Sequence, residues 1–198
     1  MTAVAPRPDF AVARRAMIDS QLRTSGVNEP WVLERMLAVP REDFVPENAR
    51  VAAYVDRALP LGEGRMLPAP LVHARMLSEA RPQPADRVLV VDSGSGYLAA
   101  LLEGLAGSIT TARAEDAARG AIKGDCTLLL IDGAVEHIPA ALAKRVADGG
   151  RVVTGLAEDA VTRLAIGRKA AGAIALLPLA EIGIPRLPAF DKPKVWSF

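Results

Sequence analysis

The sequence is poor in the residues on which disulfide-stapled and nucleic-acid-binding proteins depend. Cys126 is the only cysteine among 198 residues, which excludes an intrachain disulfide and a structural zinc site built on cysteines. Because it opens an apolar run, we expect it to be a small buried hydrophobic residue. Aromatic residues make up 4% of the chain and the formal net charge is +1. This composition predicts no base-stacking surface, no basic footprint and no nucleic-acid partner.

Long hydrophobic runs are also missing. The first 17 residues lack the apolar segment of a secretory signal. The most apolar late stretch, AGAIALLPLAEIGIP at 171–185, is too short to span a bilayer and contains Pro178 and Glu181. We therefore expect a cytoplasmic protein that has no membrane partner. Its length allows one domain over residues 1–198 with a substantial core.

Residues 1–80 are expected to form an N-terminal helical segment that includes an acceptor-loop region. Asp9 predicts the start of a helix to about Thr24, and Asn28 predicts the start of a second helix with Pro30 in its first turn. Further helices are predicted at 46–54 and 70–80. Between them, RALPLGEGRML at 57–67 has turn residues and no periodicity, which predicts a loop.

Residues 81–198 have a different pattern, in which short apolar runs alternate with short helical stretches. We predict strands at 88–91, 108–112, 127–131 and 151–156, and helices at 97–105 and 139–146. Continuous apolar strands that alternate with helices imply an α/β fold with a mostly parallel sheet covered on both faces. The tail from Ala160 predicts a closing antiparallel hairpin. The last residues, KPKVWSF at 192–198, predict a terminal strand, with partner binding as the alternative.

One stretch, RVLVVDSGSGYLAALL at 87–102, has the layout of a cofactor site. A buried strand leads into Gly94, Ser95 and Gly96, and a helix follows. In open parallel sheets ligands bind beyond the carboxyl ends of the strands, where glycines let the backbone approach the ligand. Asp92 stands where the first glycine of such a turn usually sits. Its interpretation is open between an altered cofactor contact and a polar cap on the following turn.

Four segments, in order along the chain, together resemble the protein-L-isoaspartate O-methyltransferase family. They are residues 17–47, 87–102, 128–142 and 147–153, of which VPREDFVPE (39–47) and GSGY (94–97) are the most specific. The enzymes of this family transfer a methyl group from S-adenosylmethionine to the isoaspartyl carboxylate of damaged proteins. The resemblance implies a Rossmann-like methyltransferase sheet, S-adenosylmethionine as cofactor, and a protein or peptide with isoaspartyl residues as partner.

The resemblance also implies a set of site residues. Pro68 occupies the position of the family's acceptor-site serine, and Asp132 would face both cofactor and acceptor; the alternative for Asp132 is a turn residue in a strand-end Asp-Gly. Neither His73 nor His137 has a partner at metal-ligand spacing, so both are interpreted as surface or helix-flanking residues and no metal is expected. The implied cofactor contacts are Asp92, Ser93, Gly94, Ser95, Gly96, Arg113, Asp132 and Gly133.

Departures from the family pattern bear on activity. Val90 and Asp92 replace the acid and the first glycine of the strand motif. Arg113 stands where a carboxylate receives the ribose hydroxyls, and an arginine has no acceptor lone pair. The segment between Arg113 and Cys126 is far shorter than the strand–helix–strand unit of on the order of 30 residues, so one strand is expected to be missing. The acceptor loop also lacks its serine.

Two functions are therefore open. In the first, the chain is a working S-adenosylmethionine-dependent carboxyl methyltransferase, since methyl transfer depends mostly on positioning. In the second, it is a pseudoenzyme that has lost cofactor binding and serves as an interaction or regulatory module. The departures in the pocket favour the second function. The sequence carries no indication of an oligomeric state.

Overall fold

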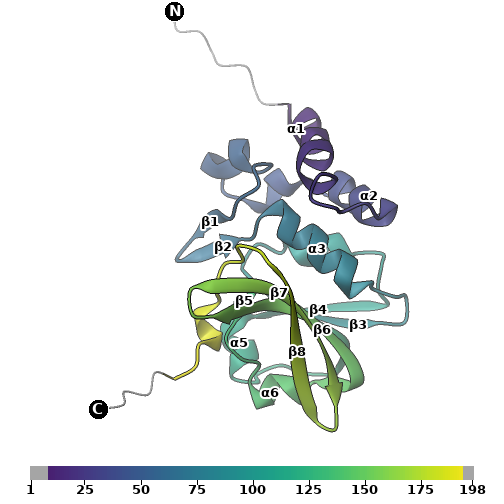
Figure 1. Cartoon of the computed structure of the whole chain (residues 1–198), viewed down its shortest axis with the longest axis vertical. Helices are drawn as coiled ribbons and strands as arrows, with labels where there is room; N and C mark the ends of the chain where they lie inside the picture. Colours follow the sequence, from purple (N-terminus) through teal and green to yellow (C-terminus); the bar gives the residue numbers. More distant parts are fainter. Residues whose placement is uncertain (1–8, 194–198) are drawn as a thin grey trace, which may run out of the picture.

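A computed structural model describes residues 9–193, in which a helical N-terminal part lies against one face of an α/β sheet (Figure 1). The terminal strand predicted for KPKVWSF falls largely outside the described residues. None of the helices between residues 9 and 193 is long and apolar enough to cross a membrane.

The first helix begins where the sequence predicts it. The Asp9 carboxylate accepts hydrogen bonds from the N–H groups of Ala11 and Val12, at 3.0 and 3.1 Å. These bonds satisfy donors that an α-helix leaves free at its start. The helix α1 spans Phe10–Met17 and continues into a π-helical turn, η1, at Ile18–Leu22.

The next helices differ in detail from expectation. The helix α2, Pro30–Ala38, follows Glu29, so the prediction that Asn28 caps it is wrong by one residue. Two short 3-10 helices come next, η2 at Arg41–Phe44 and η3 at Glu47–Ala52. The second covers most of the helix predicted at 46–54, with the tighter turns of a 3-10 helix.

The predicted loop at 57–67 is wrong, because most of it forms a small antiparallel hairpin. Its strands are β1, Leu59–Gly62, and β2, Arg65–Leu67. Glu63 and Gly64 form the turn, with φ of +53° and +74°. Such positive φ angles at both central residues match the twist of a tight hairpin. The helix that follows, α3 at Pro70–Ala80, agrees with its predicted bounds.

The main sheet has six strands among the described residues, in the order β4-β3-β5-β6-β7-β8. The first four are parallel neighbours, and the last two run antiparallel as the predicted closing hairpin. This confirms the mixed α/β fold. The strands are β3 Arg87–Asp92, β4 Ser108–Arg113, β5 Cys126–Val135, β6 Val146–Glu158, β7 Val161–Ala170 and β8 Ala173–Glu181. The strand β6 thus begins five residues earlier than predicted, because Val146 already pairs with Cys126.

The connection from β4 to β5 is short, as its length predicts. Residues 114–125 contain only the five-residue helix α5, Ala114–Ala118, and no strand. The sheet therefore ends at β4 on that side. The two remaining α-helices among the described residues are α4, Tyr97–Leu102, and α6, Ala140–Ala143, both shorter than the sequence predicts, and a 3-10 helix, η4, follows at Pro188–Phe190.

Strand β5 separates two buried apolar clusters. Leu128 and Leu130 belong to the cluster shared with α3, α4 and the N-terminal helices, whereas Leu129 and Ile131 belong to the cluster under α5 and α6. Side chains alternate across a strand, so this strand is buried on both faces. Figure 1 shows the same arrangement, with α3 above the sheet and α5 and α6 below it. Cys126 at the start of β5 is buried as predicted, and its burial raises the pKa of the thiol to about 11.

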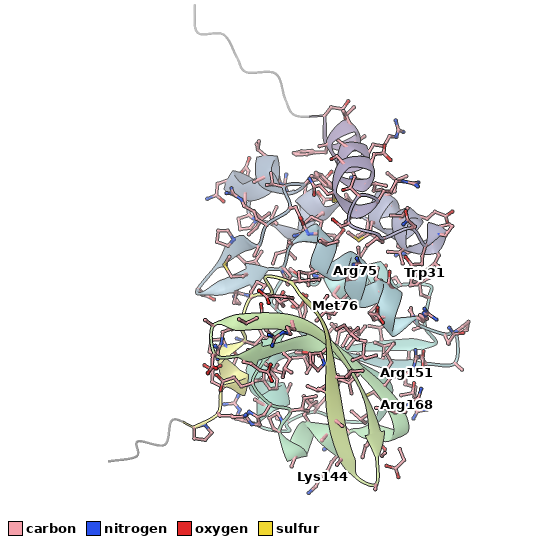
Figure 2. All side chains as sticks on the ribbon, viewed as in Figure 1. Trp31, Arg75, Met76, Lys144, Arg151 and Arg168 are labelled. Atoms are coloured by element: carbon pink, nitrogen blue, oxygen red, sulfur yellow. The ribbon has the colours of Figure 1, made fainter. Side chains whose placement is uncertain are left out.

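A polar cluster ties α3 to the amino ends of the strands. Asp86 accepts a hydrogen bond from Thr127 Oγ1 at 2.8 Å and pairs with Arg151, which also binds the carbonyl at the end of α3. Burial alone would raise the pKa of Asp86, but the hydrogen bonds to Arg151, Gln83 and Thr127 outweigh it and lower that pKa. Arg151 on β6 is the register partner of Arg168 on β7 (Figure 2).

Truncation of one central leucine should test the buried sheet. Leu130→Ala removes a fully buried side chain from β5, so the free energy of unfolding should fall by about 2–5 kcal/mol in a denaturant titration. Leu177→Ala, on the edge strand β8 where the leucine is 61% exposed, should change it by less than about 0.5 kcal/mol. Equal losses in the two variants would contradict this core assignment.

Candidate functional site

A cavity of about 760 Å³ opens beyond the carboxyl ends of β3 and β4. Its volume lies within the range of about 300–1,000 Å³ typical of small-molecule sites. Three parts of the chain enclose it besides the strand ends: the hairpin turn, the glycine turn after β3, and a tail segment after β8. The lining residues are Glu63–Met66, Asp92–Gly94, Arg113–Glu115 and Pro185–Ala189.

Asp92 holds the glycine turn in shape. Its Oδ2 accepts a hydrogen bond from the N–H of Gly94 at 2.8 Å, and its Oδ1 accepts one from the N–H of Gly96 at 2.9 Å. Both glycines have positive φ, +106° and +75°, a region that other residues rarely adopt. Burial, assisted by the nearby charge of Asp132, raises the pKa of Asp92 above its ordinary value. The side chain therefore caps the turn and also borders the cavity.

A cation lies directly over this turn. A methyl group placed on Gly94 would fall 2.8 Å from Cδ and 2.9 Å from Nη1 of Arg65. Arg65 is half-exposed at the start of β2, where it forms an ion pair of 3.1 Å with Glu63. Sequence reasoning missed this contact, because nothing in the local sequence shows that the hairpin folds back onto the turn.

At the end of β4 the cavity is bordered by one cation and one carboxylate. Arg113 pairs in register with Asp92 on the neighbouring strand, but its side chain is 81% exposed. Glu115, two residues later, also lines the cavity, and its Oε2 lies 3.7 Å from Nε of Arg113. Glu115 therefore supplies a carboxylate at this edge of the cavity, where Arg113 has none.

Beneath the cavity, four polar side chains from distant parts of the sequence form a buried chain. Nδ1 of His73 lies 3.1 Å from Nη1 of Arg41, and Nε2 of His73 lies 2.8 Å from Oδ1 of Asp132. Ser93 Oγ lies 2.7 Å from Oδ2 of the same carboxylate. Arg41, His73 and Asp132 are fully buried, and Ser93 is 5% exposed.

The expectation that His73 is a surface or helix-flanking residue is wrong. It lies on the buried face of α3, between the 3-10 helix that carries Arg41 and the strand that carries Asp132. A buried imidazole needs partners for both ring nitrogens, and these two residues supply them. Their separation from His73 in the sequence hid the arrangement. The second histidine, His137, is partly buried after β5.

Arg41 anchors this chain. Its guanidinium donates to the carbonyl of Ala53 at 2.8 Å and to the carbonyl of Pro68, and it lies 5.1 Å from the centre of the Tyr97 ring. Burial lowers the pKa of Arg41. Pro68 is itself buried and does not line the cavity.

The structure thus brings together only some of the predicted site residues. Asp92, Ser93, Gly94 and Arg113 line the cavity. Ser95, Gly96, Asp132 and Gly133 do not: Ser95 Oγ accepts from the N–H at the start of α4, and a Cβ on Gly133 would fall 2.5 Å from Cγ of Leu187 in the tail segment. Among residues 9–193, no cluster of three or more His, Cys, Asp or Glu side chains could hold a metal ion.

Comparisons with known proteins agree on one family. A family model described as protein-L-isoaspartate(D-aspartate) O-methyltransferase matches residues 13–114. A protein-L-isoaspartate O-methyltransferase of Koribacter versatilis is 36% identical over 197 residues, covering 85% of this chain and 89% of that protein. One from Roseiflexus sp. is 37% identical over 170 residues, covering 73% and 78%.

Solved structures share the fold. A crystal structure from Plasmodium falciparum, assigned to the protein-L-isoaspartate O-methyltransferases and in complex with S-adenosyl-L-homocysteine, superposes with a TM-score of 0.68 at 17% identity, covering 92% of this chain and all of that one. A second structure named protein-L-isoaspartate O-methyltransferase gives a TM-score of 0.69 at 16% identity, covering 88% and 65%.

Removal of the Asp92 side chain should loosen the glycine turn. Asp92→Ala leaves the N–H groups of Gly94 and Gly96 without their partners, so the free energy of unfolding should fall by about 1 kcal/mol in a denaturant titration. Asp19→Ala, which removes an exposed carboxylate paired with Arg23, should cost less than about 0.5 kcal/mol. An unchanged stability of Asp92→Ala would show that the capping bonds are dispensable.

Proposed function

The chain belongs to the protein-L-isoaspartate O-methyltransferase family, and on that premise we propose that it is an S-adenosylmethionine-dependent methyltransferase acting on isoaspartyl carboxylates. The observation that carries this proposal is the open cavity at the carboxyl ends of β3 and β4. Neither Asp92 nor Arg113 fills it, although both depart from the family pattern. The described parts of residues 1–80 and 81–198 act as one domain in this proposal, since one buried apolar cluster includes side chains from both.

The residues around the cavity fit the cofactor in three respects. The cavity volume of about 760 Å³ is large enough for a small-molecule ligand such as S-adenosylmethionine. The absence of a side chain at Gly94 makes room for Arg65, which lies over the turn and offers a cation to a carboxylate. Arg113 stands at the position of the family's ribose-binding carboxylate, and Glu115 nearby offers acceptor oxygens to the ribose hydroxyls instead. In this proposal the cofactor is bordered by Asp92, Ser93, Gly94 and Arg113. The glycine turn is shaped by Ser95 and Gly96, and it is supported from below by Asp132 and Gly133.

The bound cofactor supplies a methyl group on a sulfonium, and the chain supplies positioning. Methyl transfer to a carboxylate, which is already a nucleophile, requires no general base, so alignment and exclusion of water carry the rate. The hairpin β1–β2 and the tail at Pro185–Ala189 wall the cavity and would limit access of water. Pro68 offers no hydroxyl to the acceptor, so we expect weaker acceptor binding than in relatives that have a serine there.

A second function, a non-catalytic interaction or regulatory module, is favoured by two observations. The Arg113 side chain is 81% exposed at the position where the family resemblance implies a ribose-binding carboxylate, and residues 114–125 contain no strand. The two functions differ in cofactor binding, which a ligand-dependent melt measures directly.

Thermal unfolding with S-adenosylhomocysteine should separate the two functions. If the cavity is a cofactor site, ligand at a hundred times its dissociation constant should stabilise the protein by about 2.7 kcal/mol, which raises the melting temperature by about 5–10 °C. The control is a melt of the same protein in matched buffer without ligand. An unchanged melting temperature at millimolar S-adenosylhomocysteine would leave only the non-catalytic module.

Glu115 should carry part of the cofactor affinity. Because Glu115→Ala removes the acceptor at the β4 end of the cavity, the dissociation constant of S-adenosylhomocysteine in calorimetry should rise about tenfold. The matched control is Asp116→Ala, since that neighbouring acid pairs with Arg119 and does not line the cavity. Equal affinities for the Glu115→Ala variant and the wild type would remove Glu115 from the site.

A further inference from the structure

We propose that Asp132, held in place by His73 and Arg41, is a positioning residue that makes Ser93 a pure hydrogen-bond acceptor toward the cavity. This inference rests on the proposed function for the identity of the ligand. It goes beyond that function by assigning a role to a buried chain of side chains, of which only Ser93 lines the cavity.

The positions of the protons in this chain follow from its chemistry. An arginine guanidinium has five donors and no acceptor, so Nδ1 of His73, at 3.1 Å from Arg41, must accept. The imidazole proton therefore lies on Nε2, which donates to Oδ1 of Asp132 at 2.8 Å. The second carboxylate oxygen, at 2.7 Å from Ser93 Oγ, accepts the serine hydrogen. Each hydrogen bond in the chain thus fixes the donor and the acceptor of the next one.

The consequence for the cavity concerns the lone pairs of Ser93. A hydroxyl has one hydrogen and two acceptor lone pairs, and Asp132 takes the hydrogen. Ser93 lines the cavity, so it can offer only lone pairs to a ligand there. S-adenosylmethionine carries strong donors, an ammonium group and two ribose hydroxyls. A donor of the ligand should therefore bind Ser93, and a ligand that presents an acceptor at that point should be rejected.

Burial makes this orientation difficult to reverse. Arg41, His73 and Asp132 have no exposed surface, so no solvent water can take over a broken bond. Breaking one link would leave a charged or polar group unpaired in a low-dielectric environment, which is costly. Arg41 is itself fixed by two backbone carbonyls, those of Ala53 and Pro68. The chain therefore acts as a rigid support for one hydroxyl at the edge of the cavity.

Asp132→Asn tests the orientation, because it reverses the Ser93 hydrogen bond. The asparagine oxygen must face Nε2–H of His73, since the opposite orientation would need a proton on Nδ1 facing Arg41. The asparagine NH₂ then donates to Ser93 Oγ, and the serine hydrogen turns toward the cavity as a donor. The dissociation constant of S-adenosylhomocysteine should rise at least tenfold, as much as or more than in Ser93→Ala.

A double-mutant cycle separates this role from a structural one. In the Ser93→Ala background no hydroxyl remains to be oriented, so Asp132→Asn should leave the dissociation constant unchanged. The matched control is Asp86→Asn, which alters a similar Asp–Thr–Arg cluster at the opposite end of the sheet. It should lower the melting temperature of the ligand-free protein without changing affinity. Additive losses of affinity, or wild-type affinity in Asp132→Asn, would overturn the proposal.

Nitrogen NMR of the ligand-free wild type tests the proton positions without any variant. The His73 imidazole should show the tautomer with the proton on Nε2; a proton on Nδ1, or on both nitrogens at neutral pH, would overturn the chain. A wild type that binds no S-adenosylhomocysteine would instead overturn the proposed function and the ligand role of Ser93, whatever tautomer is found. The two failures are therefore distinguishable.

Discussion

The buried hydrogen-bond chain from Arg41 through His73 to Asp132 and Ser93 is the interaction on which the arrangement of the site depends. Its members come from the N-terminal part, from α3, from the central strand β5 and from the glycine turn. The imidazole of His73 lies between the guanidinium of Arg41 and the carboxylate of Asp132, so the two opposite charges lie in one chain without a direct ion pair. The chain joins both halves of the protein directly beneath the cavity.

The departures from the family pattern acquire a different meaning once they are seen in space. Asp92 supplies the two bonds that hold the glycine turn, and its side chain leaves the cavity open. Arg113 points outward, while Glu115 stands at the same edge of the cavity. The short β4–β5 connection makes β4 an edge strand without closing the cavity. In the sequence these changes suggest that the cofactor site has been lost. In the structure they are compatible with a cavity that is altered but open.

Local and periodic features of this fold could be predicted from the sequence. Continuous apolar runs such as 88–91 predicted the buried strands, Pro70 marked the start of α3, and the short segment before Cys126 predicted the lost strand. The hairpin at 59–67 could not be predicted, since its pairing depends on two positive φ angles in a polar turn. The buried role of His73 was equally hidden, because its partners lie 32 and 59 residues away.

A crystal structure of the protein grown with S-adenosylhomocysteine tests the central claim most directly. We predict the ligand in the cavity between the hairpin β1–β2 and the glycine turn, with one of its N–H or O–H donors about 2.7–3.2 Å from Ser93 Oγ. Ser93 should keep its bond to Asp132 in the complex. Density for the ligand elsewhere, or a Ser93 hydroxyl turned away from Asp132, would contradict the account.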